Sequence, residues 1–95
     1  MQKYLAEFLG TGVFVYVIVA TMNPAAMGIT LAIIVLLLKD VSGGHINPAV
    51  SLAMASYGKL DTNELIPYIF SQLAGGLIGL EIFKQYPIPL TSTMI

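Results

Sequence analysis

The sequence predicts an all-α membrane protein that forms one unit over residues 1–95, with three transmembrane helices and one re-entrant half-helix. Three observations lead to this fold class. Hydrophobic residues make up 57% of the chain and charged residues 9%, and the mean hydropathy of +0.86 exceeds that of ordinary soluble domains. Apolar runs of roughly spanning length cover about residues 5–22, 26–41 and 64–84. Between the second and third runs, about residues 42–57 open with polar and turn-forming residues.

Composition and motifs exclude several functions. The net charge of −1 offers no basic surface for nucleic acid. The chain has no cysteine and one histidine, so we expect no disulfide framework, no protein-held metal and no cofactor. The pair Gly43-Gly44 leads into Asn-Pro and not into the lysine of a phosphate loop, and the sequence pairs no nucleophile with a base. We therefore expect a protein that is not an enzyme.

The first apolar run, residues 5–22, contains one carboxylate, Glu7. A cleaved signal peptide with Lys3 as its charged start is the competing interpretation, but Glu7 interrupts its onset and no small-residue cleavage site follows. A carboxylate inside a span is costly unless it has a partner. From the sequence alone, Glu7 can also lie near the interface, where headgroup water wets it.

The second run begins at a tight turn and ends at two charges. Asn23 suits a helix cap with Pro24 at the first helical position, so this Asn-Pro pair predicts a helical hairpin and no second half-helix. The run over residues 26–41 is short for a full crossing. At its end, Lys39 and Asp40 either neutralise each other at the membrane face or lie at a channel mouth.

The stretch from Ser42 to Val50 organises the chain, because it places glycines and polar residues where hydropathy predicts membrane. Asn47 is a preferred helix cap and Pro48 fits the first helical position. Gly58 ends this helix after roughly ten residues, about 15 Å, which is half the thickness of a bilayer core. The sequence therefore predicts a half-helix whose positive end lies near the midplane, after a loop that lines a cavity or is buried in protein.

The last run, residues 64–84, begins with a predicted capping box, Asp61 with Glu64, and carries Pro67 in its first turn. Gly75 and Gly79, with Gly76 beside them, predict a small-residue face for close helix contact, and Gly10 gives the first run a similar position. Gln72 is most simply a hydrogen-bonding residue between helices. The tail from Tyr86 to Ile95 contains two prolines and is expected at the surface.

At these residues the sequence resembles the aquaporin and aquaglyceroporin (major intrinsic protein) family, whose repeat carries Ser-Gly-Gly-His-x-Asn-Pro-Ala-Val before a half-helix, as at residues 42–50. The resemblance extends to residues 6–11 and 71–76, which are similar to the first and third spans of a repeat. It covers one N-terminal-type half. A full member has a second, inverted repeat, whose Asn-Pro-Ala box is followed by an arginine, whereas Val50 follows the box here.

The resemblance implies roles for single residues. Glu7 and Gln72 would brace the re-entrant loop. Met27 and Val35 fall near positions that shape the family's filter, although packing against lipid or in the core is the favoured interpretation for each. Lys39 and Asp40 depart from the family, which usually carries smaller or less charged residues there.

Passage of a solute is the chemistry that these residues suit. Asn47 offers two amide hydrogens, and the half-helix start adds a positive potential that disfavours protons and cations. If the loop is extended, its carbonyls form a row of acceptors that lead to this centre. We expect His45 to be hydrogen-bonded within the loop and not to act as a ligand or base. The predicted solute-contacting residues are Gly43, Gly44, His45, Asn47, Pro48, Ala49 and Val50, with Met27 and Val35.

Because the family's channel is formed between two inverted repeats, the resemblance implies that this single repeat is a half-channel. It would pair with an inverted second copy, or with a separate second half, to pass water and small neutral solutes. The alternative is a non-conducting assembly or modulatory subunit that docks on a full-length relative through the small-residue faces of its first and third spans. In both cases the chain is a multi-pass integral membrane protein in contact with lipid, and it binds no nucleic acid.

Overall fold

The structure is a computed structural model that describes residues 1–88, and all regular secondary structure in that range is helical. The helices are α1 (Gln2–Thr21), α2 (Pro24–Leu38), α3 (Pro48–Ser56) and α4 (Thr62–Gln85). The predicted all-α class is therefore confirmed. The predicted surface position of the tail beyond Ile88 lies outside the described residues.

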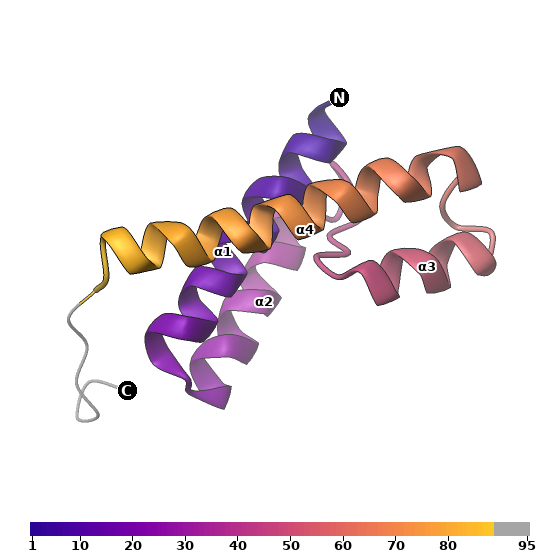
Figure 1. Cartoon of the computed structure of the whole chain (residues 1–95). Coiled ribbons are helices and arrows are strands. Elements are labelled where there is room, and N and C mark those ends of the chain that lie inside the picture. The colour runs from indigo at the N-terminus through magenta and orange to yellow at the C-terminus, as the bar shows by residue number, and fades with distance from the viewer. Residues whose placement is uncertain (89–95) are drawn as a thin grey trace.

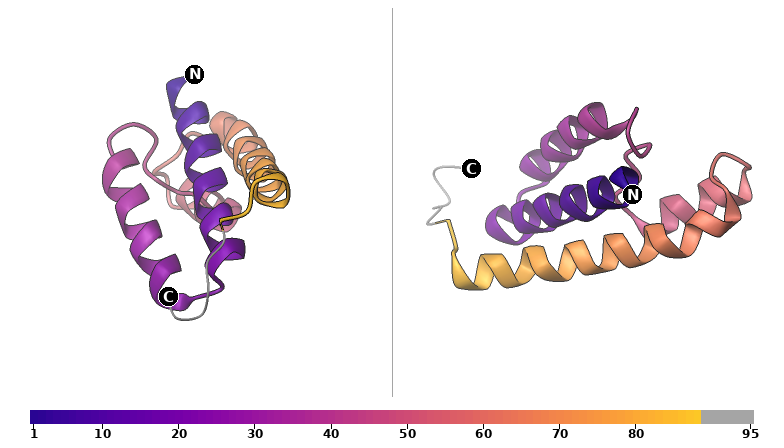
Figure 2. Two further views of the ribbon diagram at one scale, coloured as in Figure 1. Left: turned by 90° about the vertical axis from the view of Figure 1, so that its left-hand side faces the viewer. Right: turned by 90° about the horizontal axis from the view of Figure 1, so that it is seen from above.

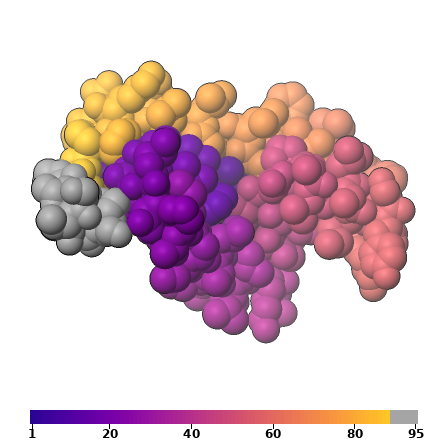
Figure 3. Space-filling view, turned by 90° about the horizontal axis from the view of Figure 1, so that it is seen from below, coloured from indigo at the N-terminus to yellow at the C-terminus, as the bar shows by residue number. Residues whose placement is uncertain are grey.

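Helix α1 lies between α2 and α4 and packs against both, while α3 packs against the first half of α4 (Figures 1 and 2). Helix α2 runs back beside α1, and α4 crosses α1 at an angle. Seen from below, α1 and α2 form one lobe of the surface, and α3 with the chain that follows it forms another (Figure 3). The loop from α2 to α3 connects these lobes and holds the polar residues of the site.

The α1–α2 hairpin has the predicted cap. Met22 ends α1 in the left-handed conformation (φ 48°), and its N–H donates to the Ile18 carbonyl at 2.8 Å. Asn23 Oδ1 then accepts a hydrogen bond from the Ala26 N–H at 2.9 Å, with Pro24 at the first helical position. This confirms the cap, although the helix begins at Pro24 and ends at Leu38, earlier than predicted at both ends.

Helix length distinguishes the elements. The 20 residues of α1 and the 24 of α4 are long and apolar enough to cross a membrane. The 15 residues of α2 measure about 22 Å, less than the roughly 30 Å of a hydrocarbon core. Helix α3 has nine residues and measures about 14 Å. The described residues thus contain two helices of spanning length where three were predicted, and the three-span topology stays a prediction.

Two predictions for the start of α4 are wrong. Asp61 lies at the cap position, but its side chain makes no capping hydrogen bond, and Glu64 pairs with Lys3 of α1. Pro67 lies inside the helix, one turn later than predicted, because α4 already begins at Thr62. Proline has no N–H to donate to the preceding turn. Separately, the ion pair between Lys3 and Glu64 connects the start of α1 to the start of α4.

Glycines allow α1 and α4 to cross in backbone contact. A Cβ atom on Gly75 would lie 2.2 Å from the Phe8 carbonyl oxygen, and one on Gly79 would lie 2.3 Å from that of Gly12. No side chain fits at either position. Gly76 is less restricted, with 3.4 Å to the nearest atom of Val15. Gly75 and Gly79 are therefore covered by α1, whereas Gly10 faces the Ile46 and Leu38 side chains. None of these three glycines is free to dock on another chain in the way the sequence suggested.

Candidate functional site

The loop of residues 42–47, here called the anchored loop, folds around one buried carboxylate. Glu7 of α1 is fully buried and accepts four hydrogen bonds. The donors are Ser42 Oγ at 2.6 Å, the His45 N–H at 3.1 Å, the Ile46 N–H at 2.8 Å and Gln72 Nε2 at 2.9 Å. An ionised carboxylate has about four acceptor positions and no donor, so these contacts satisfy it fully. Glu7 thereby joins α1, the anchored loop and α4.

A second set of hydrogen bonds fixes α3 to the same centre. Gln72 Nε2 also donates to Ser51 Oγ at 2.8 Å, and His45 Nδ1 lies 2.7 Å from that oxygen. Tyr68, one turn before Gln72, donates to the Ser42 carbonyl at 2.7 Å, and its ring contacts that of His45. The His45 side chain is therefore held between α3 and α4.

The anchored loop turns and is not extended, so the condition set for its row of carbonyls is not met. Gly43, Gly44 and Ile46 have positive φ angles of 92°, 62° and 60°. The Gly44 backbone passes so close to α2 that a Cβ atom there would lie 3.2 Å from Val35 Cα. Within residues 1–88, the carbonyls of Gly43, Gly44 and His45 accept no hydrogen bond, so these acceptors stay available despite the different path.

Asn47 caps α3 and keeps its amide hydrogens free. Its Oδ1 accepts from the Ala49 N–H at 2.7 Å, with Pro48 at the first helical position, which confirms the predicted cap. Asn47 is exposed, and its Nδ2 group donates to no described residue. Two amide hydrogens therefore lie beside the positive end of a helix.

A groove of about 570 Å³ leads away from Asn47. Ile46, Asn47 and Pro48 line one part of it, and its other walls are formed by α1 between Thr11 and Val19 and by α4 between Gln72 and Leu80. Those walls are mostly aliphatic. Of the residues predicted to contact solute, Asn47 and Pro48 line this groove. The others do not, namely Gly43, Gly44, His45, Ala49, Val50, Met27 and Val35.

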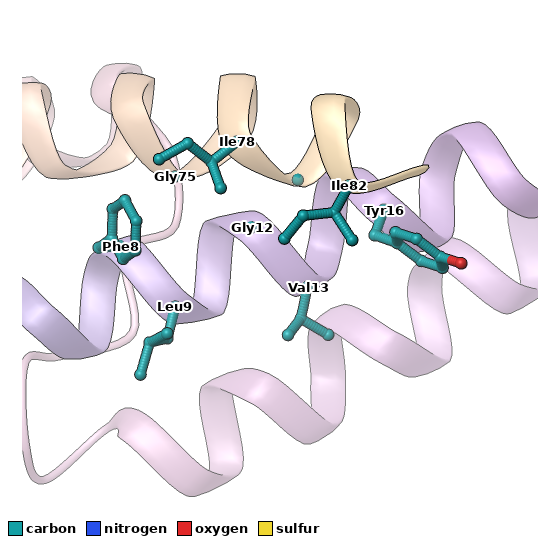
Figure 4. A pocket seen from close by; sticks show the side chains of 9 residues that line it. Phe8, Leu9, Gly12, Val13, Tyr16, Gly75, Ile78 and Ile82 are labelled. Atoms are coloured by element: carbon teal, nitrogen blue, oxygen red, sulfur yellow. The ribbon is translucent and has the colours of Figure 1, made fainter. Parts of the chain in front are cut away.

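A groove of about 250 Å³ lies along the α1–α4 crossing (Figure 4). Its lining includes Phe8, Leu9, Val13, Ile78 and Ile82, and the Tyr16 hydroxyl at its end already donates to the Tyr86 carbonyl at 2.7 Å. This groove offers a solute no free polar group. The groove at Asn47 is the better candidate for a polar solute.

Several residues of the site were missed by the sequence analysis. Ser51 and Tyr68 hold the loop and α3 in place, and Ile46 supplies both an N–H and a buried side chain. Tyr68 could have been found, because it stands four residues before Gln72 and shares its helix face. The role of Ser51 could not be predicted from the sequence, since a serine inside a short apolar helix can have many roles.

The charged residues at the end of α2, for which the sequence left mutual neutralisation or a channel mouth open, do not form an ion pair with each other. Lys39 and Asp40 are both exposed, and the ion pairs between described residues are Lys3–Glu64 and Lys84–Glu81. Mutual neutralisation of Lys39 and Asp40 by direct contact is therefore absent from this part of the chain.

The fold and site define a helical membrane protein in which a buried carboxylate anchors a polar loop ahead of a short helix. The family model described as major intrinsic protein matches residues 1–93, and the chain belongs to this family. It is an integral, multi-pass membrane protein. At the level of the family, this membership supports the predicted non-enzymatic role.

Named relatives agree with this assignment. Aquaporin-8 of Mus musculus is 40% identical over 95 residues, covering 88% of this chain and 36% of the relative. Glycerol uptake facilitator protein-like 6 of Lactiplantibacillus plantarum is 33% identical over 106 residues, covering 100% of this chain and 49% of the relative. Aquaporin Z of Photorhabdus laumondii is 33% identical over 97 residues, covering 86% of this chain and 42% of the relative. The chain thus spans less than half the length of these relatives.

Proposed function

We propose that this chain is one half of a passive membrane channel for water and small neutral solutes, and that an inverted second copy or a separate second half completes the pore. One observation carries the proposal. The Asn47 amide hydrogens have no partner among the described residues and lie at an open groove, and the three successive carbonyls that precede Ile46 accept no hydrogen bond from those residues either. Donors beside acceptors match a hydroxyl group, which accepts and donates at once.

The electrostatics of α3 support neutral solutes. Its nine residues point their positive end at Asn47, which disfavours cations and protons there. The aliphatic walls of the groove offer few competing partners, so a solute would exchange hydrogen bonds chiefly with the loop. Selection against charge would therefore rest on the backbone of α3 and not on a charged side chain.

The open side of the groove supports a second half. Helix α3 measures about 14 Å, roughly half of a hydrocarbon core, so it can line only half of a pore. The part of Aquaporin-8 that matches this chain is 36% of its length, so the whole relative is more than twice as long as the matched part. The alternative, a modulatory subunit that docks through its glycines, lacks support because Gly75 and Gly79 contact α1.

The test is osmotic water flux into proteoliposomes that contain the full chain. Asn47→Asp replaces the amide donors with a carboxylate at the positive helix end, so the cap is retained while passage should fall to the level of protein-free liposomes. Asn23→Asp is the matched control, because Asn23 also caps a helix before a proline but lies outside the groove. Its flux should equal that of the parent chain.

Two results would contradict the proposal. A folded parent chain that raises no flux above protein-free liposomes would rule out a pore made of two copies of this chain. Equal flux through the parent and Asn47→Asp would reduce Asn47 to a helix cap. Labelling of both termini in native membranes then separates the assemblies, since mixed orientation favours an inverted homodimer and a single orientation requires another half.

A further inference from the structure

Ile46 adopts a backbone conformation that its side chain disfavours. Its φ angle is 60°, in the left-handed region, where a β-branched residue is an outlier. Its side chain is only 4% exposed. A strained conformation of this kind persists only when several surrounding contacts enforce it together.

Two contacts enforce it. The Ile46 N–H donates to Glu7 Oε1 at 2.8 Å, which fixes the chain just before the strained φ angle. The side chain reaches the surface of α1 at Gly10, where a Cβ atom would lie 2.7 Å from Ile46 Cδ1 and 2.8 Å from Leu38 Cδ1. The missing side chain of Gly10 thus leaves a notch between α1 and α2, and Ile46 fills it.

Ile46 is also the main adjustable joint between the anchored loop and α3. Pro48 has a fixed φ angle, and a residue before proline is restricted to extended conformations. Asn47 obeys this restriction, with φ −156° and ψ 126°. Glu7 holds the Ile46 N–H, and α3 begins at Pro48. In the segment between these two points, the backbone angles of Ile46 have the most freedom. Their values decide where the Asn47 side chain points.

We propose that Ile46, seated in the notch at Gly10, is a positioning residue that sets the direction in which Asn47 presents its amide hydrogens. The importance of that direction for solutes rests on the proposed function. The positioning itself does not, so it is tested by a measurement that requires no solute flux.

The measurement is the NMR spectrum of the full chain in detergent micelles, labelled with ¹⁵N on the side chains of its three asparagines, Asn23, Asn47 and Asn63. Gly10→Ala places a methyl group against Ile46 Cδ1, and the Asn47 amide signals should shift or broaden. Ile46→Val removes that Cδ1 atom and keeps the β-branch. The double variant should therefore return the Asn47 signals towards their positions in the parent chain.

Matched controls separate positioning from general loosening. Gly28→Ala adds the same methyl group on α2, where nothing lies within 4 Å, and should leave the Asn47 signals unchanged. The Asn23 signals report a second cap before a proline, away from the notch, and should stay constant in every variant. Water flux in liposomes should fall with Gly10→Ala and recover in the double variant.

The proposal is overturned if Gly10→Ala leaves Asn47 unshifted, if Ile46→Val restores nothing, or if the Asn23 signals move as much as those of Asn47. If Gly10→Ala fails to fold, Ile46→Gly decides instead, since glycine adopts φ 60° without strain but leaves the notch empty. Broadened Asn47 signals would then support positioning by the side chain, and an unchanged spectrum would overturn it. Intact positioning in a chain without flux would count against a pore made of two copies and would leave the positioning role unaffected.

Discussion

At the scale of single residues, Glu7 determines the path of the anchored loop. A buried carboxylate is costly unless donors surround it, and loop amides without secondary structure are costly unless they find an acceptor. Glu7 meets both needs, because it accepts from two successive loop N–H groups, at His45 and Ile46, and from the Ser42 hydroxyl. Of the two roles that the sequence left open for Glu7, full burial rules out wetting by headgroup water.

Replacing Glu7 with glutamine should destabilise the chain. The amide turns one acceptor into a donor among four donors, and each buried group left unsatisfied costs about 1–3 kcal/mol. We expect a lower melting temperature by circular dichroism and weaker protection of the His45 and Ile46 amides from hydrogen exchange.

The matched control is Glu81→Gln, which makes the same chemical change at an exposed residue of α4 whose one ion-pair partner within residues 1–88 is Lys84. Exposed pairs contribute about 0–1 kcal/mol, so this variant should melt like the parent chain. Equal melting of both variants would show that Glu7 does not hold the loop.

At the scale of the elements, the crossing of α1 and α4 is the main packing contact of the chain. Gly75 and Gly79 of α4 lie against the backbone of α1 at Phe8 and Gly12. This close approach brings Gln72, one turn before Gly75 and Gly76, to Glu7. The glycines therefore position the site as well as the helices.

Gly79→Ala should separate α1 from α4. The added Cβ atom would lie 2.3 Å from the Gly12 carbonyl oxygen, which belongs to the backbone and cannot turn away. Overpacking of this kind costs about 1–3 kcal/mol or more, which unfolding in a graded denaturing detergent would measure.

Gly28→Ala is the control for this change, because its Cβ atom meets nothing within 4 Å and alanine favours a helix interior over glycine by about 1 kcal/mol. It should be neutral or slightly stabilising. Loss of oligomers in Gly79→Ala without loss of monomer stability would instead assign this glycine to contacts between chains.

At the scale of the whole molecule, the described residues form an incomplete enclosure. Large apolar side chains remain exposed on every long helix, among them Val13 and Leu9 of α1, Leu36 of α2 and Phe70 and Leu77 of α4. Lipid covers such surfaces in a membrane protein, and a second half would cover the groove at Asn47. By the resemblance, a full member carries an arginine after its second Asn-Pro-Ala box, whereas this chain carries Val50 after its own box, so two copies would carry valine in both places.

A pore built from two copies of this chain should pass glycerol as well as water. Valine in both boxes leaves the filter with no fixed guanidinium group, so it should be wider and more apolar. Light scattering of proteoliposomes should show glycerol entry through the parent chain, and Val50→Arg should lower glycerol flux more than water flux.

Val41→Arg is the control for added charge, since Val41 is exposed and does not line the groove. It should leave the ratio of glycerol flux to water flux unchanged. Rapid water flux without any glycerol entry in the parent chain would reject the wide filter and favour a partner half that supplies the arginine.

The sequence alone determined the features that depend on neighbours a few residues apart. Apolar runs gave the helical class and the membrane environment, and both Asn-Pro pairs, at Asn23 and Asn47, were read correctly as helix caps. Such features are local, because a cap or an apolar helix face is set within one or two turns. The capping box predicted for Asp61 and Glu64 is wrong, because Glu64 forms an ion pair with Lys3, which is distant in sequence.

Only the tertiary structure decided how the site is assembled. Gln72 reaches Glu7 across 65 positions of sequence, and His45 reaches Glu7 across 38. No pattern of spacing identifies such partners, since they depend on how closely α1 and α4 cross and on the turns at Gly43, Gly44 and Ile46. The left-handed conformation of Ile46 contradicts its local preference outright. This conformation is stabilised by the hydrogen bond to Glu7 and by packing of the side chain at Gly10, and both of these residues are distant from Ile46 in sequence.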